Sequence, residues 1–186
     1  MKKYILFFLT LICSAGLHAQ HPWAKRSLVG EVGLGTNYAL QKMFFPCSTP
    51  GLSAFGEVRY NFESLPLSIG VREQADVFQR KGRYEWQNLD YLSYRFLLVG
   101  DYHQWFSPKL VGFAGVGLGM AHLDNSENLR LDDSESSFYI DDGPYSVFSF
   151  QPRLGIILSN RIRVSVSYTF GDRANSFLGL HIGYVI

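Results

Sequence analysis

Residues 178–186 read Leu178-Gly179-Leu180-His181-Ile182-Gly183-Tyr184-Val185-Ile186, with a large apolar side chain at every second position up to the last residue. Alternation with a period of two is typical of a β-strand that has one apolar face. A soluble domain commonly ends in a polar tail, whereas a strand that closes a transmembrane barrel must meet lipid with its outer face. We therefore expect this stretch to be a transmembrane β-strand.

The same alternation recurs in seven earlier segments. They cover residues 28–35, 54–62, 67–74, 92–102, 115–120, 148–158 and 161–170. In each segment one parity is apolar and the other is charged, small and polar, or glycine; Val164 and Val166, for example, alternate with Ser165. Single-chain bacterial barrels have an even number of strands, and a closed barrel leaves no unpaired strand edge in lipid. The pattern predicts an all-β fold, a closed antiparallel up-and-down transmembrane β-barrel of eight strands.

The connections between these segments differ in length. Short connections are expected at 61–66, 103–108 and 159–160, and long ones at 40–51, 79–88 and 124–144. Outer-membrane barrels have short periplasmic turns and longer external loops. The three long connections are therefore predicted to be external, and both ends of the barrel to be periplasmic. The last outer connection, 171–176, is short for its side.

The beginning of the chain has the pattern of a secretory signal peptide. Lys2 and Lys3 precede an apolar run, and Leu17-His18-Ala19 forms a small-residue cleavage pattern before Gln20. We expect residues 1–19 to be removed on export, residues 20–26 to form a short periplasmic segment, and residues 27–186 to form the barrel. Removal would turn the formal net charge from +1 to −1 and would leave Cys47 as the single cysteine, so no intrachain disulfide is expected. A near-neutral chain without a basic tract indicates no nucleic-acid partner.

With this architecture, residues 27–186 resemble the small eight-stranded outer-membrane barrels of the OmpA/OmpX type. The closing LGLHIGYVI is similar to the terminal strand by which the barrel-assembly machinery recognises such proteins, with Tyr184 at the aromatic position and Ile186 where an aromatic residue is usual. The resemblance implies the bacterial outer membrane as location, and outer-membrane lipids and lipopolysaccharide as surroundings. It further implies surface exposure, with adhesion or envelope roles in some members and enzymatic work on lipid A in a few.

The inward parity predicts a charged lumen. An eight-stranded barrel has room for little more than its own side chains, which argues against a transport pore. Because a buried unpaired charge is strongly destabilising, we expect the inward charges to pair with one another in a network that plugs the barrel. Its predicted members, with Asp76 beside them, are Glu31, Glu57, Arg59, Arg72, Arg95, Asp101, Arg153 and Arg163.

The third external connection is strongly acidic. Its acidic residues are Asp124, Glu127, Asp132, Asp133, Glu135, Asp141 and Asp142. Part of this stretch follows the spacing of a calcium-binding loop, but Leu129 stands where that loop requires glycine. A solvated loop, loosely bridged to lipopolysaccharide phosphates by divalent cations, is the other reading. No other cofactor and no metal site are predicted.

Catalytic signals in the sequence are few. His181 has the inward parity, and His103 falls in a predicted turn. Lipid A deacylases of the resembled family carry a histidine and a serine close together on one lipid-facing strand; His122 and Ser126 match that pattern poorly. We therefore expect a non-catalytic outer-membrane protein whose external loops meet an unidentified extracellular partner. Two alternatives stay open, which are a lipid A-modifying enzyme and a soluble lipocalin-like carrier with the apolar parity turned inward.

Overall fold

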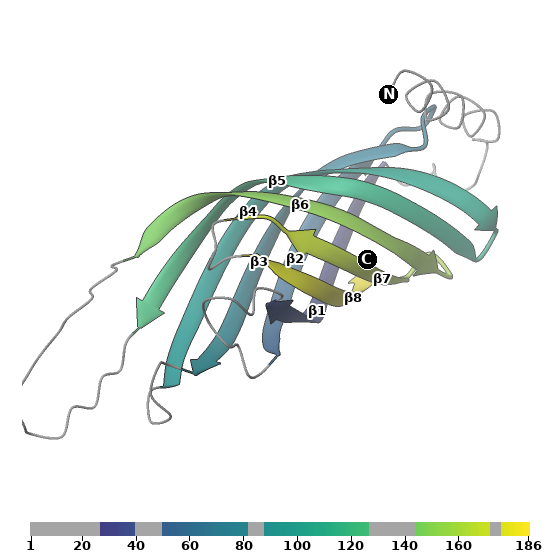
Figure 1. Cartoon of the computed structure of the whole chain (residues 1–186). Coiled ribbons are helices and arrows are strands. Elements are labelled where there is room, and N and C mark those ends of the chain that lie inside the picture. Colours follow the sequence, from purple (N-terminus) through teal and green to yellow (C-terminus); the bar gives the residue numbers. More distant parts are fainter. Residues whose placement is uncertain (1–26, 40–49, 82–87, 127–143, 172–175) are drawn as a thin grey trace, which may run out of the picture.

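The computed structural model describes residues 27–39, 50–81, 88–126, 144–171 and 176–186. These residues form a single closed barrel in which every strand is antiparallel to its neighbours (Figure 1). Its strands are β1 (Leu28–Ala39), β2 (Gly51–Asn61), β3 (Leu67–Lys81), β4 (Asn88–Ser107), β5 (Leu110–Ser126), β6 (Tyr145–Leu158), β7 (Ile162–Thr169) and β8 (Phe177–Val185). The predicted fold class is confirmed. The predicted signal peptide, residues 20–26, Cys47 and most of each long connection lie outside the described residues.

The barrel closes through the two end strands. β1 pairs with β8 from Glu31 opposite Val185 to Ala39 opposite Phe177. The strands are unequal, because β7 has 8 residues and β4 has 20. Figure 1 shows β3, β4, β5 and β6 extending past the short strands at one end of the barrel. This taller side of the wall carries the outward polar residues considered below.

One predicted turn is wrong. Residues 103–107 continue β4, and only Pro108 and Lys109 form the turn. The strand continues because His103 pairs with Phe113 and Trp105 with Val111, before the register shifts between Trp105 and Ser107. Trp105, which falls in the connection expected at 103–108, packs against an inner cluster of Val111, Phe113 and Ile157.

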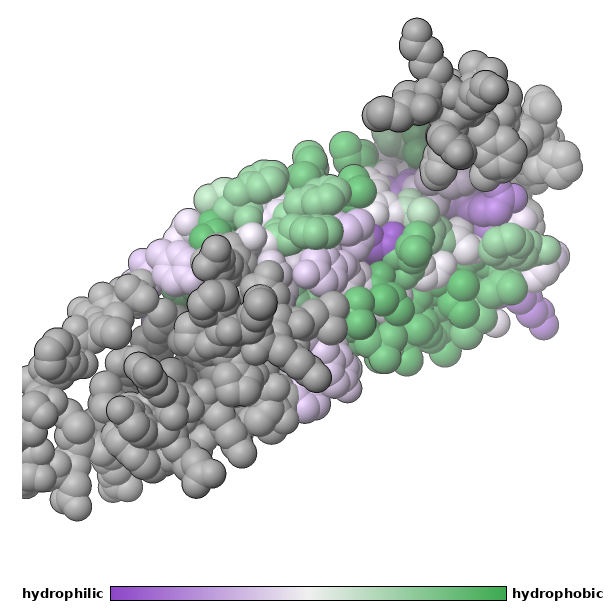
Figure 2. Space-filling model, in the orientation of Figure 1, coloured by the Kyte–Doolittle hydropathy of each residue, from purple (hydrophilic) through white to green (hydrophobic). Residues whose placement is uncertain are grey.

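The side chains alternate between the two faces of the wall. Large apolar side chains point outward along all eight strands, as Leu34, Phe96, Phe148 and Ile182 illustrate with 55–65% exposure. Figure 2 shows apolar residues over much of the outer surface. The buried inner side chains are mostly polar or charged. This is the reverse of a lipocalin-like carrier, which would direct its large apolar face inward.

Inward-facing glycines allow the charged side chains to fit. A Cβ added at Gly115 would collide with the Asp101 carboxylate, and one added at Gly183 would collide with the Glu31 carboxylate. A narrow barrel needs such small residues beside large ones. The described residues include no helix long and apolar enough to span a membrane.

Candidate functional site

Glu57 is the centre of the charged lumen. Its side chain lies on β2, and the Arg153 guanidinium of β6 reaches it across the barrel, donating to Oε2 at 2.6 Å and to Oε1 at 3.0 Å. Arg72 donates to Oε2 at 3.3 Å from the neighbouring strand β3. Arg59 and Arg163 lie at ion-pair distances of 3.4 and 3.6 Å from Oε1. Glu57 therefore joins arginines from four strands.

Two further carboxylates extend the same network. Asp101 of β4 accepts two hydrogen bonds of 2.8 Å from Arg153 and one of 2.7 Å from Arg163. Glu31 of β1 accepts from Arg59 at 2.6 Å and from Arg163 at 3.4 Å. The side chains of all these residues are at most 2% exposed. Bidentate pairing of this kind fixes both the distance and the orientation of the guanidinium planes.

A second group of polar side chains lies beside the first. Asp76 of β3 accepts hydrogen bonds from Arg95 and Asn37, and from Gln74 at 2.8 Å. Arg95 also donates to Thr169 on β7 at 3.1 Å. The two groups are connected because Arg72 donates to Gln74 at 3.1 Å. Side chains from six strands, β1 to β4, β6 and β7, thus form one continuous network.

The predicted lumen residues are therefore all buried, and each of them is hydrogen-bonded to another member of the network. The described inward residues include five arginines and four carboxylates, so one positive charge is in excess. Three guanidinium groups lie over aromatic rings: Arg163 is 3.6 Å from the centroid of Phe113, Arg72 is 3.7 Å from that of Phe55, and Arg95 is 4.2 Å from that of Phe177. The negative ring faces partly offset the excess charge.

Two histidines are also buried in the lumen. His103 was expected in a periplasmic turn, but it is 2% exposed and its Nε2 lies 3.0 Å from Ser68 Oγ. The reason is the continuation of β4, whose alternation turns this side chain inward. His181 makes an edge contact with Phe55 at 5.7 Å between ring centroids. Neither histidine is hydrogen-bonded to a serine and a carboxylate together among the described residues, so neither forms a catalytic triad there.

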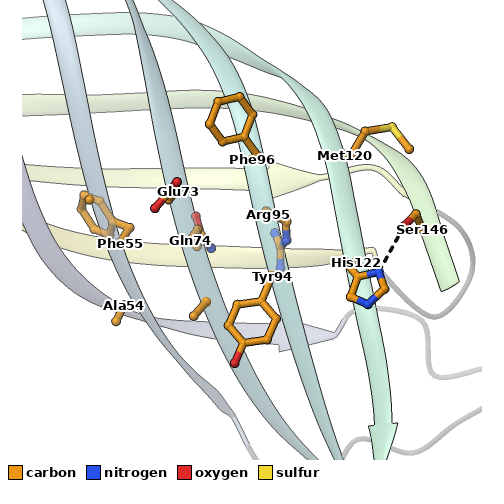
Figure 3. A pocket seen from close by; sticks show the side chains of 12 residues that line it. Ala54, Phe55, Glu73, Gln74, Tyr94, Arg95, Phe96, Met120, His122 and Ser146 are labelled. Carbon is orange, nitrogen blue, oxygen red and sulfur yellow. Dashed lines mark hydrogen bonds between the residues drawn. The ribbon is translucent and has the colours of Figure 1, made fainter. Parts of the chain in front are cut away.

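The outer wall has a groove of about 690 Å³ across β2 to β6. Small residues Ala54, Gly56 and Ala75 line it beside the larger Tyr94 and Met120. Figure 3 shows Ala54, Tyr94 and Met120 among the side chains around this groove. The exposed charged or polar side chains of its lining are Glu73, His122 and Ser146, whereas Gln74 and Arg95, which also line it, are buried. Of the three exposed ones, His122 and Ser146 are hydrogen-bonded to each other, with 3.1 Å between Nδ1 and Oγ.

The structure pairs His122 with Ser146, whereas the sequence pattern offered Ser126 as its partner. His122 lies directly opposite Ser146 in the β5–β6 ladder, whereas Ser126 lies four residues further along β5. A histidine within hydrogen-bond distance of a serine hydroxyl can act as a general base on it. Within the described parts of the chain, no carboxylate is hydrogen-bonded to this histidine ring. A motif restricted to one strand could not identify Ser146, because this contact depends on the register of two strands.

Glu73 is a second residue that the alternation alone did not single out. It is exposed on the outer face of β3, between the outward residues Val71 and Ala75. Its neighbours across the ladder are Gly56 on β2 and Phe96 on β4. The sequence held one signal for Glu73, which is a charged residue at a position where the alternation of β3 otherwise places apolar side chains.

The acidic connection is only partly described. Asp124 is exposed at the end of β5, and the other six acidic residues of this stretch lie outside the described residues. Across the described ranges, no cluster of three or more histidine, cysteine or acidic residues has a geometry that could hold a metal ion. The calcium-loop spacing itself falls mostly beyond these ranges.

The comparisons with known proteins identify the fold. No family profile and no curated sequence matches this chain. Among solved structures, Neisserial surface protein A matches with a TM-score of 0.53 and 11% identity, over 86% of this chain and 94% of that one. The attachment invasion locus protein Ail of Yersinia pestis, in complex with a heparin analogue, matches with a TM-score of 0.50 and 13% identity, over 86% and 97%. The outer-membrane enzyme PagL matches with a TM-score of 0.45 and 13% identity, over 85% and 98%.

Proposed function

We propose that this protein is a non-catalytic barrel of the bacterial outer membrane, with a structural or surface-interaction role carried by its external loops. It has the fold of the small eight-stranded outer-membrane barrels. The observation that supports the proposal most strongly is the combination of an apolar outer wall with a lumen filled by paired charges. Such a molecule is stable in lipid and leaves no wide path for solutes.

The contacts inside the barrel support the proposal that charged side chains plug the lumen. Arg153 and Arg163 span it between Glu31, Glu57 and Asp101, and opening a path would require breaking several buried ion pairs together. With transport disfavoured, the external loops are the parts available to partners outside the cell. We assign to them the extracellular partner, with divalent cations and lipopolysaccharide phosphates as candidate ligands of the acidic connection that begins near Asp124.

Two measurements test this proposal on the full chain. Cell fractionation, followed by electrophoresis with and without boiling, is expected to recover the protein in the outer membrane with a heat-dependent change in mobility. The purified protein in planar lipid bilayers is expected to show no ion conductance. Recovery in the soluble periplasm would contradict the membrane location, and steady ohmic conductance would contradict the plugged lumen.

A second candidate function is supported by the His122–Ser146 pair. The pair lies at the end of the apolar groove, where Tyr94 is the neighbour of His122 on β4. A serine activated by histidine could attack an ester of a lipid whose acyl chain occupies the groove, as a lipid A-modifying enzyme would require. The absence of an orienting carboxylate on His122 among the described residues makes this the weaker candidate.

Mass spectrometry of lipid A separates the two functions. Cells that express the wild-type chain, Ser146→Ala or the control Gln104→Ala are compared with cells that lack the protein; Gln104 is a polar residue of β4 remote from the pair. The non-catalytic proposal predicts identical lipid A in all four. A mass change present with wild type and Gln104→Ala, and lost with Ser146→Ala, would establish the enzyme instead.

A further inference from the structure

Glu73 is out of place on the outer wall. Over residues 67–77, the part of β3 whose side chains are described, the outward residues are Leu67, Ile69, Val71, Glu73, Ala75 and Val77. At least two apolar positions therefore separate the carboxylate from either end of this series. Phe96 flanks it on β4 with 55% exposure. If the wall faces lipid, as proposed above, this carboxylate lies within the apolar belt.

Among the described residues, Glu73 has no ion-pair partner. All the described ion pairs lie inside the barrel, and the side chains of the described lumen arginines are at most 3% exposed. Acyl chains have no group that can hydrogen-bond a carboxyl group. Ionisable residues that face the membrane interior are expensive and mark functional contacts with other polar groups.

A shallow depression in the outer surface at Gly56, called the dent below, adjoins the Glu73 carboxylate. Gly56 is the direct ladder neighbour of Glu73 on β2, and a Cβ added at Gly56 would meet no heavy atom within 4 Å. The inward glycine Gly115 differs, because a Cβ there would collide with Asp101. Internal packing therefore does not require glycine at position 56. Ala54 and Ala75 widen the dent, and small residues of this kind allow close approach of two membrane proteins.

We propose that the β2–β3 face, defined here as Ala54, Gly56, Glu73 and Ala75, is the contact surface for a second copy of this chain. A protruding residue and a dent side by side on adjacent strands are self-complementary under a two-fold axis. An axis along the membrane normal, passing between Glu73 and Gly56, places each Glu73 side chain in the dent of the other copy. Each carboxyl group then has the Glu73 side chain of the other copy as a polar neighbour at the same depth.

A second copy fits these features better than other occupants. A lipid acyl chain would fill the dent and leave the carboxyl group without a polar partner. A different membrane protein would need its own donor at the same depth, whereas a second copy brings Glu73 and the dent at matched depth by symmetry. Polar side chains and small residues together are the combination that joins transmembrane surfaces.

Cross-linking in lipid vesicles tests the surface. The full mature chain carries Cys47→Ser and either Gly56→Cys or the control Val166→Cys, which is exposed on β7 on the other side of the barrel. After reconstitution in phosphatidylcholine vesicles and oxidation with copper-phenanthroline, Gly56→Cys is expected to give at least about fivefold more covalent dimer than Val166→Cys. Equal yields from the two positions would mean random collision and would overturn the proposal.

Filling the dent is the second test. Gly56→Leu is expected to fold, because its side chain enters open space, and to weaken dimerisation about tenfold or more in sedimentation equilibrium in detergent micelles. Glu73→Leu is expected to weaken it as well, while Ala114→Leu, on the outer face of β5, leaves it unchanged. A wild-type chain that inserts, shows heat-dependent mobility and stays monomeric would overturn this inference alone. Failure to insert would instead contradict the membrane location, and cross-linking in cells to another protein but never to itself would replace the second copy by that partner.

Discussion

Replacing Glu57 by glutamine is the most direct test of the lumen network. Glu57 contacts four arginines, more than Asp101 with three or Glu31 with two. Glutamine keeps the size of the side chain but removes its charge, and it turns one acceptor into a donor that faces guanidinium donors. The five lumen arginines would then face three carboxylates. Removing one partner of a buried ion pair typically lowers the free energy of unfolding by about 3–5 kcal/mol.

The measurement is urea unfolding of the folded chain in detergent or lipid, followed by the mobility difference between boiled and unboiled samples. With an m-value of about 2 kcal/mol per molar urea, the midpoint of Glu57→Gln is expected about 1.5–2.5 M below that of the wild type. Glu63→Gln is the matched control, since Glu63 is exposed in the turn between β2 and β3. Its free energy of unfolding is expected to change by less than about 0.5 kcal/mol. A Glu57→Gln midpoint equal to that of Glu63→Gln would refute the idea that paired charges hold the lumen together.

Three further changes probe other features by the same unfolding assay. Asp76→Leu with Arg95→Met, which replaces a buried pair by apolar residues, is expected to be at least about 2 kcal/mol more stable than Asp76→Leu alone, and a double variant as unstable as the single one would contradict the pairing. Gly115→Ala is expected to lose about 1–3 kcal/mol through its collision with the Asp101 carboxylate, whereas Gly56→Ala stays near wild type; similar losses at the two positions would be evidence against the close lumen packing. Ser159→Gly is expected to gain a few tenths to about 1 kcal/mol, because Ser159 has φ of 50° in the β6–β7 turn, and a loss of stability would show that its side chain has another role.

The strand pattern could be predicted because the two faces of the wall meet opposite surroundings. Each strand alternates strictly over most of its length, so parity alone separated Val164 from Arg163 and Phe96 from Arg95. The ends of strands were harder to predict. His103 and Trp105 fall in the connection expected at 103–108, but ladder pairing with Phe113 and Val111 extends β4 through them. How far a strand extends depends on the neighbouring strands with which it can pair, and one segment does not contain that information.

The contacts inside the lumen illustrate the same limit. Inward parity selected Arg153 and Glu57, which are 96 positions apart, but nothing in the pattern indicated that they meet across the barrel. That contact depends on the register of every ladder between β2 and β6. The pairing of His122 with Ser146 depends on a single ladder and could not be identified either. Parity predicts the face of a residue, whereas register determines its partner.

Some polar residues have a structural reason for being where they are and others do not, and this contrast indicates where a specific function is to be sought. Each lumen arginine has a structural reason for its charge, because a carboxylate or a ring face lies against it. Glu73, His122 and Ser146 have no such reason, since the stability of a lipid-facing wall would favour apolar residues at all three positions. A polar group kept where it lowers stability is most simply explained by a contact that the isolated barrel does not make. The wall between β2 and β6 therefore deserves the first functional experiments together with the external loops, because the lumen charges are already accounted for by the packing of the barrel.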